Sequence, residues 1–199
     1  MEVIREREGL RRRARHLAWL TVGWNSVECV VAVGAGVAAG SIALVGFGLD
    51  SLVEVFAGSV VLWRLAGDDQ ERERRALRLI AVSFFALAAY VVAESVRDLV
   101  VGSEAEESVV GIALAVVSLL VMPALALAKW RTGEALGDPV VVADSAETRL
   151  CAYLSVVLLA GLVLSGFGLR WADPLAALVI AGLAVREGRE AWRGEDCCP

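Results

Sequence analysis

Six apolar stretches follow one another along the chain of 199 residues, separated by short connections rich in glycine, proline or charge. The first five are long enough to cross a bilayer, because a spanning helix needs roughly 20 apolar residues. The sixth is shorter and continues toward residue 192 as an amphipathic segment. The stretches cover residues 17–38, 42–62, 79–101, 109–128, 140–161 and 174–185. This pattern predicts an all-α integral membrane protein with six transmembrane helices.

The composition agrees with a membrane protein. Hydrophobic residues make up 58% of the chain and its mean hydropathy is +0.66, so a soluble domain of this size would expose large apolar patches. The first apolar stretch is too long for the core of a signal peptide and lacks a small-residue cleavage pattern, so we expect it to remain as a helix. We therefore expect a multi-pass protein of the cell membrane, with the lipid bilayer as a partner and no nucleic acid.

The basic residues set the orientation. If the N-terminus is cytosolic, sixteen of the nineteen Lys and Arg residues lie at cytosolic ends of the helices, as the positive-inside rule requires. These residues are Arg5, Arg7, Arg11, Arg12, Arg13, Arg15, Arg64, Arg72, Arg74, Arg75, Arg78, Lys129, Arg131, Arg186, Arg189 and Arg193. We thus expect a cytosolic N-terminal basic segment (1–16), a six-helix transmembrane domain (17–192) and a short cytosolic tail (193–199), with both termini cytosolic.

Two carboxylates, Asp50 and Glu54, lie in the middle of the second apolar stretch. A helix places residues four apart on one face, so both side chains point the same way at membrane depth. An ionised side chain near the bilayer centre costs roughly 2.5 to 3.5 kcal/mol on insertion scales. The pair therefore predicts a polar cavity, a bound cation or protonation.

The fifth apolar stretch repeats this spacing with Glu147 and Cys151. Carboxylate and thiolate are both metal ligands, and their spacing places them on one helix face. Two simpler interpretations remain open. Glu147 pairs with Arg149 or Arg97 in one of them, and Cys151 is a small buried hydrophobe in the other.

The second stretch resembles a known family. Residues 40–44 read Gly-Ser-Ile-Ala-Leu and precede Asp50 and Glu54. This order is similar to the second helix of cation diffusion facilitator (CDF) metal transporters, in which a Gly-Ser-x-Ala-Leu lead-in comes before a His/Asp-Ser-Leu-x-Asp motif. The resemblance extends over the whole six-helix body.

The later part of the chain carries the same resemblance. Residues 143–151 look like the fifth-helix CDF pattern Ala-Asp-x-x-His-x-x-x-Asp, with Glu147 and Cys151 at the two ligand positions. Residues 173–177, Asp-Pro-Leu-Ala-Ala, look like the start of the sixth CDF helix. The resemblance implies a transporter that exports a divalent cation from the cytosol, often in exchange for protons.

The implied metal site has four ligands, Asp50, Glu54, Glu147 and Cys151. The usual histidines of the family are absent, and His16 lies at the cytosolic edge. Three carboxylates and one thiolate suit Zn²⁺ in tetrahedral geometry, so Zn²⁺ is the first choice as substrate. Fe²⁺, Mn²⁺, Co²⁺, Ni²⁺ and Cd²⁺ remain open.

The chain stops at Pro199, so we expect a short form that lacks the C-terminal cytosolic domain of the family. A homodimer would then form through the transmembrane helices. Cys197 and Cys198 either capture soft metal at the cytosolic mouth or belong to a disordered end. Cys29 and Cys151 lie within apolar stretches, where reduced thiols are more typical than disulfides.

Other polar residues join the predicted helices. Asn25 and Glu28 share a face of the first helix, so Glu28 either joins the metal site or takes a proton when metal leaves. Near the outer end of the third helix, Glu94, Arg97 and Asp98 predict an internal ion pair or a helix interface. Glycines that would allow close helix contacts, and hence tilting of the second and fifth helices, are Gly34, Gly36, Gly40, Gly46, Gly48 and Gly58.

Rival functions remain. A cation channel or membrane scaffold would move no protons against metal, and a metal sensor or storage protein would bind without flux. An enzyme is not expected, because the acids have no histidine partner, activated serine or phosphate-binding loop beside them in the sequence.

Overall fold

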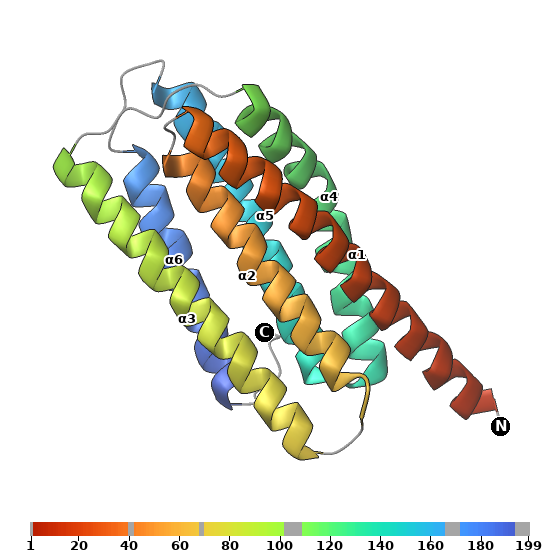
Figure 1. Ribbon diagram of the computed structural model, residues 1–199. Coiled ribbons are helices and arrows are strands. Elements are labelled where there is room, and N and C mark those ends of the chain that lie inside the picture. Colours follow the sequence, from red (N-terminus) through yellow and green to blue (C-terminus); the bar gives the residue numbers. More distant parts are fainter. Residues whose placement is uncertain (1, 40–41, 68–69, 102–108, 166–171, 194–199) are drawn as a thin grey trace.

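The structure is a computed structural model that describes residues 2–39, 42–67, 70–101, 109–165 and 172–193. All of the described secondary structure is helical, which confirms the predicted fold class. The helices are α1 (Glu2–Ala39), α2 (Ile42–Arg64), α3 (Gln70–Val101), α4 (Val109–Leu136), α5 (Pro139–Ser165) and α6 (Ala172–Arg193). They run side by side with alternating direction, so the N-terminal end of α1 and the C-terminal end of α6 lie at the same end of the bundle (Figure 1). We call this the basic end, and the positive-inside rule predicts that it faces the cytosol.

The helices are longer than the apolar stretches that predicted them. The charged residues 2–16 continue into α1, and residues 70–78, expected as a connection, form the first turns of α3. Arginine and glutamate are good helix formers, and Glu71 Oε1 accepts from Arg75 Nε at 2.9 Å one turn away. Hydropathy therefore marked where the apolar environment begins, whereas helical hydrogen bonding extends beyond it.

Polar and apolar positions are distributed as a membrane requires. By length and composition, α1, α3 and α4 each contain a stretch that is able to cross a bilayer. Leu20, Val30 and Leu120 are among the most exposed side chains, while Asn25 and Glu28 are buried. A soluble protein shows the reverse pattern, so the outer surface of the bundle is suited to lipid.

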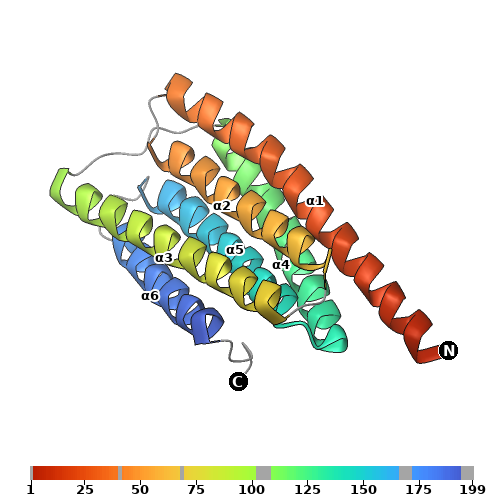
Figure 2. The ribbon, with the colours of Figure 1, turned by 60° about the horizontal axis from the view of Figure 1, so that its bottom comes forward.

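Helix α5 lies at the centre of the bundle. It packs most extensively against α4 and also contacts α2, α3 and α6, while α1 pairs with α2 and α3 pairs with α6. Figure 2 shows α5 between α3 and α4. Every residue from 140 to 148 is buried, polar and apolar alike. The first half of α5 therefore meets protein on all sides, and its polar side chains have to be satisfied inside the bundle.

Two of the predicted glycines hold α1 and α2 close together. A Cβ atom on Gly48 would lie 2.7 Å from Val33 Cγ2, and one on Gly58 would lie 2.9 Å from Val22 Cγ2. The prediction is wrong for Gly34, because no described atom lies within 4 Å of a Cβ built there. Gly40 lies outside the described residues. The close contacts at Gly48 and Gly58 make α1 and α2 a tightly packed pair.

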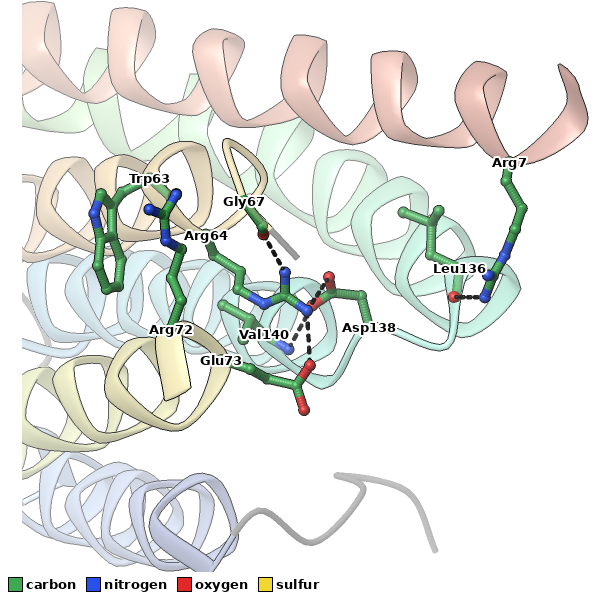
Figure 3. A network of polar contacts seen from close by, with 9 residues as sticks. All are labelled: Arg7, Trp63, Arg64, Gly67, Arg72, Glu73, Leu136, Asp138 and Val140. Atoms are coloured by element: carbon green, nitrogen blue, oxygen red, sulfur yellow. Dashed lines mark hydrogen bonds and ion pairs between the residues drawn. The ribbon is translucent and has the colours of Figure 1, made fainter. Parts of the chain in front are cut away.

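Arg64, the last residue of α2, links three segments at the basic end (Figure 3). Its Nη2 atom lies 2.7 Å from Glu73 Oε2 in α3 and 3.4 Å from Asp138 Oδ2 in the α4–α5 turn. Its Nη1 atom donates to the Gly67 carbonyl at 2.8 Å. Asp138 also accepts from the backbone N–H of Val140 at 3.1 Å, as a capping residue does. Arg64 therefore fixes the ends of α2 and α3 to the start of α5.

The local sequence explains the turn between α4 and α5. Gly137 has a φ of 63°, a conformation that favours glycine after a helix C-terminus. Arg7 Nη2 lies 3.5 Å from the carbonyl of Leu136, so α1 also reaches this turn. In Figure 3 these contacts lie together at the basic end.

We expect Arg64→Ala to destabilise the bundle by about 2 to 3 kcal/mol, because two partly buried carboxylates lose their cation. Thermal unfolding of the purified protein in detergent measures this change. The matched control is Arg74→Ala, whose pair with Glu71 is exposed and long at 3.9 Å, so no measurable change is expected. Equal melting temperatures for the two variants would contradict the linking role of Arg64.

Candidate metal site

The four predicted ligands are all buried in the bundle, two on α2 and two on α5. Asp50, Glu54, Glu147 and Cys151 are 4%, 1%, 2% and 1% exposed. The Cys151 thiol is hydrogen-bonded to the Asp50 carboxylate, which joins the two helices directly. Because the helices are antiparallel, Glu54 and Glu147 both lie one turn closer to the basic end than that contact. The two half-motifs thus meet across one helix interface.

Several oxygen atoms at this interface lack a hydrogen-bond donor. Among the described residues, Asp50 Oδ2 and Glu147 Oε2 are buried without a partner, and neither Glu54 oxygen has a hydrogen bond of normal geometry, although Asn25 of α1 lies within reach of that carboxylate. Buried polar atoms in folded proteins are nearly always hydrogen-bonded, so several unpartnered carboxylate oxygens need an explanation. A cation bound between the helices would satisfy these atoms, as would protons on the carboxylates.

The arrangement is not a closed metal cage. No three His, Cys, Asp or Glu side chains within the described ranges are grouped closely enough to hold a metal ion. The direct contact between the two helices at this level is the pair Asp50 and Cys151. The four-ligand assignment therefore stays a prediction.

Glu147 does not form the ion pair with Arg149 that was one of the predicted alternatives. Its Oε1 atom lies 2.9 Å from Ser83 Oγ in α3, and this hydroxyl also lies 2.7 Å from the carbonyl of Ile80. Arg149 instead pairs with Glu187 of α6 at 3.0 Å. Glu147 is therefore a carboxylate held by a neutral donor, and the alternative of an ion pair with Arg149 is wrong.

Arg97, the other cation considered for Glu147, pairs with Glu94 of its own helix at 3.5 Å. This contact confirms the predicted ion pair between Glu94 and Arg97, although it lies at a partly exposed position and links no second helix. The side chain of Asp98 lies outside the described residues.

Helix α1 contributes Asn25 and Glu28, which are buried as their shared face predicted. Glu28 Oε2 accepts from Ser51 of α2 at 3.0 Å, and Glu28 Oε1 accepts from Ser118 of α4. Both oxygens are thus engaged, and Glu28 joins three helices. Asn25 donates to the Thr21 carbonyl at 3.1 Å, while its Oδ1 atom has no partner among the described residues. A metal or proton role for either residue remains a prediction.

Lys129 lies in the half of α4 nearer the basic end, and the sequence did not predict its partner. It is 1% exposed and lies 2.7 Å from Asp144 Oδ2 of α5. Its Nζ atom also donates to Thr148 Oγ1 at 2.9 Å. Asp144 lies three residues before Glu147 and is itself an acid in an apolar stretch, so its need for a cation was the signal that could have found Lys129.

Cys29 and Cys151 are free thiols in the described part of the chain, as predicted. Cys197 and Cys198 lie outside the described residues. Helix α6 begins at Ala172, and Pro174 occupies its first turn, in agreement with the predicted start of the sixth helix.

Comparison with known proteins supports the motif resemblance. A family model described as the cation efflux transmembrane domain matches residues 78–193, more than half of the chain. The chain is 25% identical over 166 residues to the magnetosome protein MamB of Magnetospira sp., covering 78% of this chain and 57% of that protein. It is 37% identical over 79 residues to the cation-efflux pump FieF of Shewanella oneidensis, covering 40% and 27%.

A third relative is transmembrane protein 163 of Xenopus laevis, 23% identical over 143 residues, which cover 70% of this chain and 51% of that protein. The chain thus spans about half the length, or less, of the curated relatives it matches. The match to the family model includes residues 78–101 of α3 and the whole of α4, α5 and α6. Together with the α2 and α5 motifs, this match shows that the chain belongs to the cation efflux family, the cation diffusion facilitators.

Proposed function

We propose that this protein exports a divalent metal cation from the cytosol, with Zn²⁺ as the preferred substrate, in exchange for protons. The observation that carries the proposal is the set of buried carboxylate oxygens on α2 and α5 that lack hydrogen-bond partners among the described residues. Inside an apolar bundle such atoms are costly unless a cation or proton reaches them. A transported ion that visits and leaves the site accounts for both their burial and their lack of fixed partners.

The proposed ligands are Asp50, Glu54, Glu147 and Cys151. The hydrogen bond between Asp50 and Cys151 brings one ligand of each helix together, and the free oxygens of Glu54 and Glu147 lie one turn nearer the cytosol. Small movements of α2 against α5 would let all four converge on one ion. A thiolate together with carboxylates favours Zn²⁺ over Mg²⁺, which prefers oxygen ligands alone.

Exchange with protons follows from the ligand chemistry. Carboxylates and thiols bind metal only when deprotonated, so metal entry expels protons and proton entry expels metal. The Arg64 contacts close the basic end around the starts of α3 and α5. We propose that this end opens to admit the cytosolic ion, with α1 and α2 moving as one unit because of the close contacts at Gly48 and Gly58. A homodimer through the transmembrane helices is part of the proposal.

Metal flux into proteoliposomes tests the transport function. We expect Zn²⁺ uptake by the wild-type protein to fall more than about tenfold in Asp50→Asn, Glu54→Gln, Glu147→Gln and Cys151→Ser, since each removes a ligand. Ser59→Ala is the matched control, because Ser59 is exposed and bonds only to the Val55 carbonyl of its own helix at 2.7 Å. Binding without flux in the wild-type protein would favour the sensor or storage function. Unchanged flux in all four variants would end the ligand assignment.

Proton coupling is measured with a pH-sensitive dye inside the same liposomes. Addition of Zn²⁺ outside should make the lumen more alkaline, because each ion that enters displaces protons from the carboxylates and the thiol. Glu54→Gln should abolish this signal. Zn²⁺ uptake without any accompanying proton movement would instead indicate a channel.

Ser83→Ala probes how Glu147 is held. Loss of the hydroxyl leaves Oε1 of Glu147 without its donor, and loss of an outer-shell hydrogen bond typically costs on the order of tenfold in metal affinity. Equilibrium Zn²⁺ binding to the purified protein gives the value, with Ser59→Ala again as control. An affinity equal to that of the wild-type protein would show that Ser83 does not orient Glu147 in the metal-bound state.

A further inference from the structure

We propose that α3 and α6 together form a binding surface for one anionic phospholipid at the basic end of the bundle, where Arg78 and Arg189 contact the lipid phosphate. We call this surface the α3–α6 seam. Its residues are Arg78, Val82 and Phe85 of α3 and Val185, Arg189 and Trp192 of α6. The seam shares no residue with the proposed metal site, so this inference stands apart from the proposed transport function.

Helices α3 and α6 lie side by side, on the side of the bundle away from α1 (Figure 2). Gly188 allows a close approach, because a Cβ atom built on it would lie 3.0 Å from both Phe84 Cβ and Phe85 Cε1. Nearer the basic end, the guanidinium carbon of Arg78 lies 5.9 Å from the centre of the Trp192 ring, a cation–π contact. These two contacts join the seam residues of α3 to those of α6.

The seam residues form one row on each helix. In both helices they are spaced by four and then three residues, which places them above one another on one face. The two rows meet where Arg78 contacts Trp192. Val82, Val185 and Trp192 are 52%, 40% and 53% exposed, and both arginines are exposed as well. The seam is therefore a continuous outer surface that lipid can reach.

The polarity along the seam matches that of a phospholipid. Arg78 directly precedes the third apolar stretch, which begins at residue 79, and Arg189 follows the end of the sixth, at residue 185, by about one turn. Val82 and Val185 lie on the membrane side of these arginines, where acyl chains would contact them. Trp192 lies on the other side, and tryptophan is enriched at the boundary between membrane and water.

The two arginines of the seam carry charge that no protein anion neutralises. Within the described ranges, neither Arg78 nor Arg189 forms an ion pair. The acids nearest to them in the sequence already pair with other arginines. These pairs are Glu71–Arg75 (2.9 Å), Glu73–Arg64 (2.7 Å), Glu187–Arg149 (3.0 Å) and Glu190–Arg186 (2.8 Å). The seam therefore has a net positive charge, which favours an anionic headgroup over a zwitterionic one.

Both arginines lie beside the same ring, so one phosphate lies within reach of both. Arg78 contacts Trp192 across the helix interface, and Arg189 precedes Trp192 by three residues on α6. Guanidinium groups form charge-assisted hydrogen bonds with phosphate oxygens. A second copy of the chain fits this surface less well, because a symmetric dimer would bring the arginines of the two seams together.

The test is native mass spectrometry of the purified full chain in detergent, titrated with phosphatidylglycerol or with phosphatidylcholine that carries the same acyl chains. We expect the wild-type protein to bind the first phosphatidylglycerol about 20-fold more tightly than phosphatidylcholine, at roughly fivefold for each arginine. Arg78→Gln and Arg189→Gln should each weaken phosphatidylglycerol binding about fivefold and leave phosphatidylcholine binding unchanged. The double variant should bind the two lipids about equally.

Two variants control for charge. Arg12→Gln removes the same charge from an exposed position at the basic end of α1, which packs against α2 and α4, and it should leave phosphatidylglycerol binding unchanged. Arg189→Lys keeps the charge and should retain most of the preference for phosphatidylglycerol. Helical circular dichroism and elution as a single species establish that each variant is folded. If Arg78→Gln does not fold, the comparison of Arg189→Gln with Arg189→Lys still decides.

Several results would overturn the proposal. Equal binding of the two lipids by the wild-type protein would contradict an anionic lipid site, and equal weakening in Arg12→Gln would show a general effect of positive charge. Displacement of phosphatidylglycerol by millimolar inorganic phosphate would show an anion site that does not need the lipid. A shift from dimer to monomer in the double variant, with or without lipid, would assign the seam to a second copy of the chain.

Discussion

The structure depends on how buried charge is satisfied where water is excluded. Carboxylates from α1, α2 and α5 lie inside the bundle, and they differ in the hydrogen-bond or ion-pair partners that they have. Glu28 accepts two serine hydrogen bonds, Asp144 has a lysine, and Glu147 has one serine donor. In the described part of the chain, Glu54 has no hydrogen bond of normal geometry and only the neutral Asn25 within reach. The hydrogen bonding of these acids thus ranges from complete to incomplete, and the proposed ion site uses the acids whose hydrogen bonding is incomplete.

The packing supports this division of roles. Gly48 and Gly58 bring α1 and α2 into close contact, and Glu28 joins this pair to α4. Central α5 meets four other helices, so a change at its polar residues is felt across the bundle. At the basic end, Arg64 holds α2 against α3 and the start of α5 through two carboxylates. In the proposed transport cycle, α1 and α2 would move as a pair, and the Arg64 contacts would have to break.

The family match and the sequence motifs support different parts of the structure. The match to the cation efflux domain covers residues 78–193 and leaves out α1 and α2. The α2 ligands thus rest on the spacing of Asp50 and Glu54 and on the contact between Asp50 and Cys151. The absence of histidine from the four proposed positions distinguishes this chain from the family pattern, and it makes the site richer in carboxylates.

The sequence by itself determined the six helices and the spacing of the acids along α2 and α5, because hydropathy and a spacing of four residues are properties of a single segment. It could not predict that α1 and α3 extend into their charged ends, since helix formation continues past the apolar region. The tertiary structure alone decided that Glu147 meets Ser83 instead of Arg149, and that Lys129 turns inward to Asp144. Such partners depend on which helices pack together and how they are rotated about their axes, and this follows from the fit of whole surfaces that no single segment encodes.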